Sequence, residues 1–154
     1  MLIGLDQLTK YCATQALTYG QPLAIFPGFN LTLLHNTGAA FSVLATATGW
    51  QRWVLSALGI GASAYIVMLL RSPLTASRRY RVALSLILSG AIGNLIDRLM
   101  HGYVVDFIQV YYDRWYWPAF NIADSAISIG AVLVGYEILF GPRASDARAD
   151  DRCV

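Results

Sequence analysis

Charged residues are scarce in this sequence: they make up 13% of its 154 residues, whereas hydrophobic residues make up 56%. An ordinary soluble domain has about 25% charged residues, so the composition argues against a soluble globular protein. The net charge is only +2, and no basic run alternates with aromatic residues, which argues against a nucleic-acid partner. The length allows one domain. The composition therefore predicts a small polytopic membrane protein.

Cysteine and histidine are also sparse. Cys12 and Cys153 lie near opposite ends of the chain and give no disulfide framework or metal knuckle. His35 and His101 have no ligand partner at metal spacing, and the His-Glu-x-x-His motif is absent. There is no Gly-x-Ser-x-Gly motif, and no serine or cysteine is accompanied by a plausible base. We therefore expect no metal, no other cofactor and no covalent nucleophile.

Four apolar segments of roughly 17–19 residues are each just long enough to cross a bilayer as a helix. They cover residues 1–17, 53–70, 82–100 and 123–140. The first is the weakest, because Asp6, Gln7 and Lys10 interrupt it, and it lacks the basic start of a signal peptide. We expect an all-α integral membrane protein with four transmembrane helices in residues 1–142. The polar residues 143–154 are expected to form a disordered cytoplasmic tail.

Arginine is unevenly distributed between the connections. Seven arginines lie in the turn between the second and third segments and in the tail, whereas residues 18–51 contain neither lysine nor arginine. The connection between the third and fourth segments contains only Arg114. The positive-inside rule therefore places the arginine-rich turn and both termini in the cytoplasm, and the two long connections outside.

Both outward connections carry patterns of their own. Residues 23–42 contain the alternating run FNLTLLHN and turn formers at Pro27-Gly28 and Asn36-Thr37-Gly38, which predict a small β element at the outer surface. Residues 109–120 gather tyrosine and tryptophan, which concentrate at the level of lipid headgroups. This second stretch is expected to be an interfacial segment.

Two aspartates adjoin these connections. Asp106 lies in YVVDFI and Asp124 in NIADS, so both should face outward beside apolar segments, where a charge is costly and is a functional candidate. Two close carboxyl groups share one proton, which allows one to activate water while the other polarises a carbonyl. Asp124 could instead simply stabilise a helix N-terminus. That alternative does not explain Asp106, which has no cap to serve.

Polar residues also recur at helical spacing within two of the apolar segments. Asn94 and Arg98 share one face of the third segment, where they could contact substrate or orient the aspartates, or simply join helices. Asp6 and Lys10 are likewise one turn apart in the first segment. For this pair a structural ion pair near the outer end of the helix is the favoured interpretation.

Taken together, four blocks of sequence resemble the bacterial lipoprotein signal peptidases (signal peptidase II). They cover residues 6–10, 36–42, 93–107 and 120–125, and the likeness extends over essentially all of residues 2–140. The resemblance implies a four-helix aspartyl protease of the bacterial inner membrane, with its active site facing the periplasm. Such enzymes remove the signal peptide of a prolipoprotein by cutting before its diacylglyceryl-modified cysteine. Relatives usually have more apolar residues before the first block, so the first helix is expected to be short of its start.

The resemblance also assigns roles to residues. Asp106 and Asp124 match the catalytic pair of the family. The supporting positions of the site are Asn36, Gly38, Asn94, Arg98, Asn121, Asp6 and Lys10. Among them, Gly38 is expected to allow a turn or a close backbone approach, and the Asp6–Lys10 pair is less directly tied to chemistry. The expected partners are a diacylated prolipoprotein and membrane lipids, and the expected state is a monomer.

Two other functions would fit part of this pattern. A small transporter or proton-conducting protein also carries intramembrane acids, but it predicts acids at several depths and two similar halves. Here the key acids converge on one face and no internal repeat is visible. A non-enzymatic membrane anchor or assembly subunit leaves Asp106 unexplained.

Overall fold

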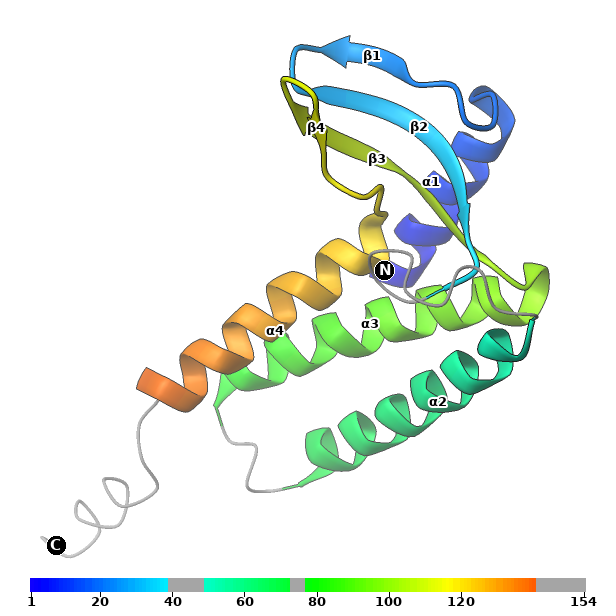
Figure 1. The fold of residues 1–154 in the computed structure, drawn as a ribbon. Coiled ribbons are helices and arrows are strands. Elements are labelled where there is room, and N and C mark those ends of the chain that lie inside the picture. The colour runs from blue at the N-terminus through cyan, green and yellow to red at the C-terminus, as the bar shows by residue number, and fades with distance from the viewer. Residues whose placement is uncertain (39–48, 73–76, 141–154) are drawn as a thin grey trace, which may run out of the picture.

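The computed structural model describes residues 1–38, 49–72 and 77–140, which form four helices and a small sheet (Figure 1). The helices are α1 (Leu2–Ala16), α2 (Trp50–Arg71), α3 (Arg78–His101) and α4 (Ile122–Phe140). The strands are β1 (Leu23–Phe26), β2 (Phe29–Asn36), β3 (Val104–Tyr112) and β4 (Trp115–Tyr116). Helix α3 runs between α2 and α4, and the sheet lies at the end of the helices where α3 ends and α4 begins (Figure 1).

Three helices in the described part of the chain, α2, α3 and α4, are long and apolar enough to cross a membrane. This confirms a mostly helical membrane protein with three candidate spans, where the sequence predicted four. Helix α1 has 15 residues, or about 22 Å at 1.5 Å per residue, against a hydrocarbon core of about 30 Å. The predicted disordered tail lies outside the described residues.

Helices α3 and α4 approach each other closely at two glycines. A Cβ atom on Gly90 would collide with the backbone carbonyl oxygen of Ala123, and one on Gly130 would lie 2.7 Å from the carbonyl oxygen of Ala83. Small residues at such contacts let membrane helices pack backbone against backbone. The first turn of α4, which contains Asp124, is thereby held against α3.

The sheet is antiparallel, with the strand order β1-β2-β3-β4. The hairpin predicted within residues 23–42 is confirmed over residues 23–36, and its turn uses Gly28 with a positive φ of 89°; residues 39–42 lie outside the described residues. The sheet is larger than predicted, however, because residues 104–116 contribute two further strands. The expected interfacial segment is therefore mostly part of this sheet: Tyr111 pairs with Tyr116, and aromatic and β-branched side chains favour such pairing.

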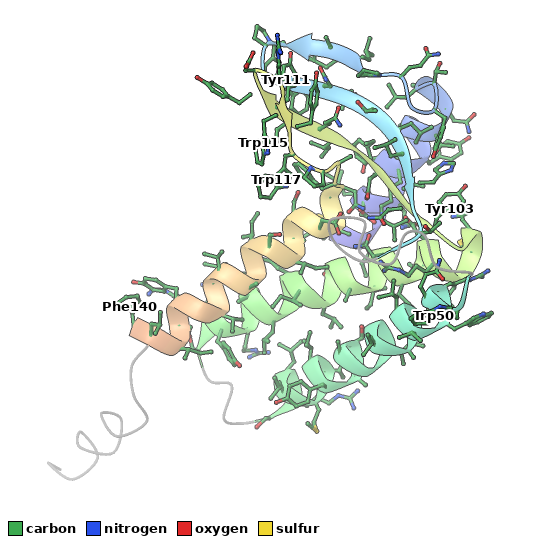
Figure 2. The ribbon with its side chains drawn as sticks, viewed as in Figure 1. Trp50, Tyr103, Tyr111, Trp115, Trp117 and Phe140 are labelled. Carbon is green, nitrogen blue, oxygen red and sulfur yellow. The ribbon has the colours of Figure 1, made fainter. Side chains whose placement is uncertain are left out.

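Aromatic side chains gather where the sheet lies. Tyr111, Trp115 and Trp117 lie together on the sheet side of the molecule, whereas Phe140 lies at the opposite end of α4 (Figure 2). Trp115 is 60% exposed, which is typical of a ring that meets the membrane interface rather than a protein core. The aromatic content of the sheet is consistent with a position at the membrane surface.

Candidate active site

Asp124 is fixed in the first turn of α4 by a reciprocal pair of hydrogen bonds with Asn121. The backbone N–H of Asp124 donates to Asn121 Oδ1 at 2.9 Å, and the backbone N–H of Asn121 donates to Asp124 Oδ2 at 3.3 Å. This is the geometry of a capping box, with Asn and Asp in place of the usual Ser and Glu. The helix N-terminus also favours a negative charge there. The short sequence NIAD thus caps α4 and places its carboxylate at the same time.

Asp106 lies on β3 and is only 2% exposed. Its Oδ1 accepts a hydrogen bond from Asn121 Nδ2 at 2.7 Å, and its Oδ2 accepts one from Asn36 Nδ2 at 3.1 Å. Asp106 was expected just beyond the third apolar segment, residues 82–100. In the structure Gly102 ends α3 in a left-handed conformation, and Asp106 follows on a paired strand.

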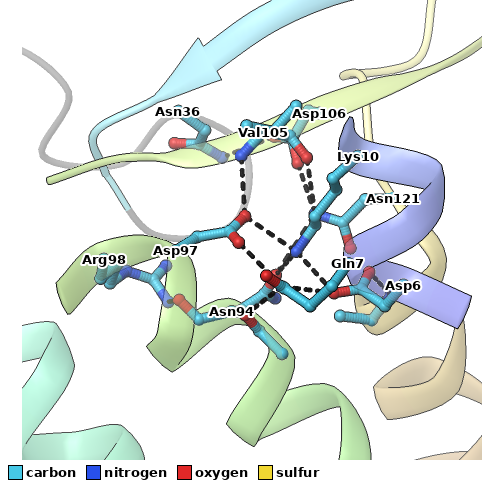
Figure 3. Close-up of polar contacts among 12 residues, drawn as sticks. Asp6, Gln7, Lys10, Asn36, Asn94, Asp97, Arg98, Val105, Asp106 and Asn121 are labelled. Carbon is cyan, nitrogen blue, oxygen red and sulfur yellow. Dashed lines mark hydrogen bonds and ion pairs between the residues drawn. The ribbon is translucent and has the colours of Figure 1, made fainter. Parts of the chain in front are cut away.

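Asn94 on α3 completes a continuous chain of hydrogen bonds between the two aspartates. Its Nδ2 donates to Asp124 Oδ1 at 2.7 Å, and its Oδ1 accepts from Asn121 Nδ2 at 3.3 Å. Asn121 in turn contacts Asp106, as Figure 3 shows for the labelled residues. The structure therefore brings Asp106, Asp124 and two predicted asparagines into one hydrogen-bonded network.

The surroundings of Asp106 favour its protonated form. Burial away from solvent, followed by the nearby Asp124 carboxylate, raises the pKa of Asp106 to about 7. The hydrogen bonds from Asn36 and Asn121 and the charge of Lys10 act in the opposite direction. Near neutral pH the pair can therefore hold one proton between two carboxylates, as hydrolysis by a carboxylate pair requires.

Arg98 and Gly38 hold the chain that follows β2 against α3. Arg98 Nη2 donates to the carbonyl oxygen of Gly38 at 3.2 Å, and Nη1 donates to the carbonyl oxygen of Asn94 at 3.4 Å. The backbone N–H of Gly38 donates to Asn36 Oδ1 at 3.0 Å, which is an Asx-type turn. The turn aims the other end of the Asn36 amide at Asp106.

Asp6 and Lys10 form the predicted ion pair, with Lys10 Nζ 2.9 Å from Asp6 Oδ2. The pair is not confined to α1, however, because Lys10 Nζ also lies 2.9 Å from Asp97 Oδ2 and 3.0 Å from Asn94 Oδ1. Asp97 was not among the predicted site residues. It could have been found from its spacing, since Asp97 lies three residues after Asn94 and one before Arg98, on the same polar side of α3.

A cavity of about 700 Å³ extends from this network between α2, α3 and α4. Asn94 and Asp124 line its polar end, and its walls include Trp117, Ile127 and Ile129. Among the described residues, no group of three His, Cys, Asp or Glu could hold a metal ion. The arrangement offers a proton-sharing carboxylate pair beside a cavity with mostly apolar walls. It is suited to hydrolysis of a bond presented from the membrane.

Comparison with known proteins identifies the family of this chain. A family model described as signal peptidase (SPase) II matches residues 1–140. The chain belongs to the signal peptidase II family. The lipoprotein signal peptidase of Burkholderia mallei (strain SAVP1) is 52% identical over 139 residues, which cover 90% of this chain and 83% of the relative. That of Janthinobacterium sp. (strain Marseille) is also 52% identical, over 90% of this chain and 84% of the relative.

A solved structure is similar in fold as well. It is described as a bacterial membrane enzyme, and it matches this chain with a TM-score of 0.80 and 32% sequence identity, over 90% of this chain and 82% of the other. The resemblance predicted from four sequence blocks is therefore confirmed, and the chain is a peptidase of the multi-pass membrane type. The roles of its individual residues stay predictions.

Proposed function

We propose that this chain is an aspartyl endopeptidase that removes signal peptides from prolipoproteins by cutting before the diacylglyceryl-modified cysteine. The observation that carries the proposal is the hydrogen-bonded path from Asp106 through Asn121 and Asn94 to Asp124, at the polar end of a cavity among apolar helices. Membership of the signal peptidase II family supports the peptidase class and the substrate.

In the first step, Asp124 acts as the base and Asp106 as the acid. The Asp124 carboxylate takes a proton from water, whose oxygen bonds to the scissile carbonyl carbon. Asp106 donates its proton to the carbonyl oxygen, where negative charge would otherwise develop. The raised pKa of Asp106, about 7, suits it to carry that proton.

In the second step the gem-diol intermediate collapses. The peptide nitrogen takes the proton from Asp124 as the C–N bond breaks, and one gem-diol hydroxyl returns a proton to Asp106 as the new carboxyl group forms. The pair thus regains its single proton. Asn121, Asn94 and Asn36 keep the two carboxyl groups oriented throughout, because each donates to a carboxylate oxygen.

We further propose that residues 1–142 act as one monomeric domain in the bacterial inner membrane, in contact with its lipids, with α1 as the fourth membrane helix. The arginines at the α2–α3 turn support a cytoplasmic position for that end. The sheet and both proposed catalytic aspartates would then face the periplasm. The exposed aromatic side chains of the sheet support its place at the outer membrane surface.

Labelling of single cysteines tests this orientation. In a Cys12→Ser, Cys153→Ser background, Gln21→Cys should react with a membrane-impermeant maleimide in intact spheroplasts, and Ser77→Cys should react only after the membrane is opened. Gln21 is exposed in the chain that leads to β1, so its substitution should not disturb the fold. Labelling of Ser77→Cys from outside would show that the site faces the cytoplasm.

Cleavage of a lipidated substrate tests the proposed function. Purified protein in detergent should release the signal peptide from a diacylated prolipoprotein, and a matched prolipoprotein without the diacylglyceryl group should remain uncut. The metal chelator EDTA should have no effect, because the chemistry depends only on carboxylates. Failure to release a signal peptide from the diacylated substrate would overturn the proposal.

A further inference from the structure

Two buried carboxylates outside the proposed catalytic pair each hold the backbone just before a catalytic aspartate. Asp97 Oδ2 accepts a hydrogen bond from the backbone N–H of Val105 at 3.1 Å, and Val105 precedes Asp106. Asp6 Oδ1 accepts one from the backbone N–H of Ala123 at 2.8 Å. Ala123 precedes the second aspartate of the pair in the same way. Asp97 and Asp6 are 2% and 1% exposed.

Lys10 joins these two carboxylates. Its ammonium lies 2.9 Å from Asp6 Oδ2 and 2.9 Å from Asp97 Oδ2, and the side chain is almost fully buried (Figure 3). Gln7 forms a second link, because its Nε2 donates to Asp97 Oδ1 at 2.9 Å and to Asp6 Oδ2 at 3.3 Å. We call Asp6, Lys10 and Asp97 the ion triad. It connects β3 to α4 through α1.

We propose that the ion triad positions the two catalytic aspartates and sets the separation between them. This inference rests on the proposed function. Asp97 is the positioning residue for Asp106, Asp6 is the positioning residue for Asp124, and Lys10 fixes one relative to the other. A shift of about 1 Å at a reacting group can cost on the order of 10²-fold in rate, so a fixed separation matters to catalysis.

The chemistry of the ion triad favours positioning over fold stability. Buried ion pairs contribute little stability relative to apolar residues of the same volume, so stability alone does not account for three buried charges. The packing makes room for them as well: a Cβ atom on Gly93 would lie 2.6 Å from Asp6 Oδ2, so Asp6 reaches its position only beside a glycine. Each carboxylate also accepts a hydrogen bond from the backbone N–H of the residue that precedes a catalytic aspartate.

The ion triad also acts on Asp106 electrostatically. The charged groups around Asp106 are Asp124 on α4, Arg98 and Asp97 on α3, and Lys10 on α1. Of these, Lys10 lowers the pKa of Asp106. Loss of the ammonium should therefore raise that pKa, and the pair should keep its proton to a higher pH. The alkaline limb of the activity profile should move upward.

Kinetics of Lys10→Met and Asp97→Asn, alone and combined, test the inference on the full-length enzyme with a diacylated prolipopeptide. Each single variant should lose about 100-fold in kcat with KM within about threefold, because the loss falls on alignment and not on binding. The double variant should be little worse than the worse single variant, since both residues act through one connected group. Lys10→Met should shift the alkaline limb upward.

Matched controls remove the same charges elsewhere. Arg79 is exposed at the start of α3, and Glu137 lies about 20 Å along α4 from Asp124. Arg79→Met and Glu137→Gln should therefore both keep the activity of the unmodified enzyme. Gln7→Met breaks the second link while leaving every charge in place, so it should fold and should lose about fivefold in kcat. If the charge variants do not fold, the kcat of Gln7→Met tests the positioning role in their place.

Unchanged kcat in the variants that fold, or a purely additive double variant, would overturn the inference. So would a loss confined to thermal stability or to KM. An unmodified enzyme that does not cleave would instead remove the proposed function itself, and this inference with it. If the unmodified enzyme and the two controls cleave normally, failure of the triad variants to lose kcat counts against the positioning role alone.

Discussion

Asp106→Asn and Asp124→Asn should each lower kcat for signal-peptide release by about 10⁴-fold or more, while the protein still inserts into the membrane and binds substrate. Asparagine keeps the shape of each side chain but can neither take a proton from water nor give one to the carbonyl oxygen. Loss of either group in a proton-transfer pair removes most of the catalysis, because the two act as a unit. Release of signal peptide from a diacylated prolipoprotein measures the loss.

The control for these variants is Glu137→Gln, which neutralises a carboxylate near the other end of α4. It should cleave as the unmodified enzyme does. Binding of the substrate by Asp106→Asn and Asp124→Asn, measured by co-purification, separates lost chemistry from lost folding. Near-normal turnover by either variant would end the aspartyl-protease interpretation.

The same Asp106 variant should change the pH dependence of stability. The pKa of Asp106 is raised from 3.8 to about 7, so the stability that its protonation contributes is fully present below about pH 4 and is lost as the pH rises through 7. Above that pH an ionised carboxylate is buried at a cost that asparagine does not carry. Relative to the unmodified protein, Asp106→Asn should therefore gain thermal stability at pH 8 and not at pH 4.

Hydropathy predicted three of the helices well, because membrane spans depend on local composition that a sequence displays directly. The sheet was only half predicted. Residues 23–36 show alternating apolar and polar residues and a Pro-Gly turn. The strand VVDFIQVYY instead has apolar residues on both faces, so its sequence lacks the alternation that predicts a strand. Its strand pairing depends on β2, which lies far away in the sequence.

In the site, too, local contacts could be predicted from the sequence and long-range contacts could not. Asn121 and Asp124 lie in one capping turn, so their contact is local and their motif could be recognised. The spacing of Asp97 from Asn94 marks it as a polar position on α3 but does not reveal its partners, because next to Arg98 it suggests a local charge pair. Its partners are instead Lys10 on α1 and the backbone of β3. Such contacts exist only once the helices and the sheet have packed.

Asn121→Ala should lower kcat by about 10³-fold, because one fully buried side chain serves both aspartates. Its Nδ2 lies 2.7 Å from Asp106 Oδ1 and 3.3 Å from Asn94 Oδ1, and its Oδ1 caps the N–H of Asp124. Alanine removes all of these contacts and leaves the Asp106 carboxyl group oriented only from its Asn36 side. Loss of the helix cap should also cost about 1 kcal/mol of stability.

Ser77→Ala separates the two effects, since Ser77 caps the N-terminal end of α3, far from the site, by accepting from the N–H of Tyr80. It should lower the melting temperature about as much as Asn121→Ala does, yet leave kcat within about twofold. Asn121→Asp keeps the cap acceptor but sets a third carboxylate against Asp106, so its kcat should fall at least as far as that of Asn121→Ala. If Asn121→Ala loses stability but no more activity than Ser77→Ala, then Asn121 is only a helix cap, and the two aspartates are oriented by Asn94, Asn36 and the ion triad alone.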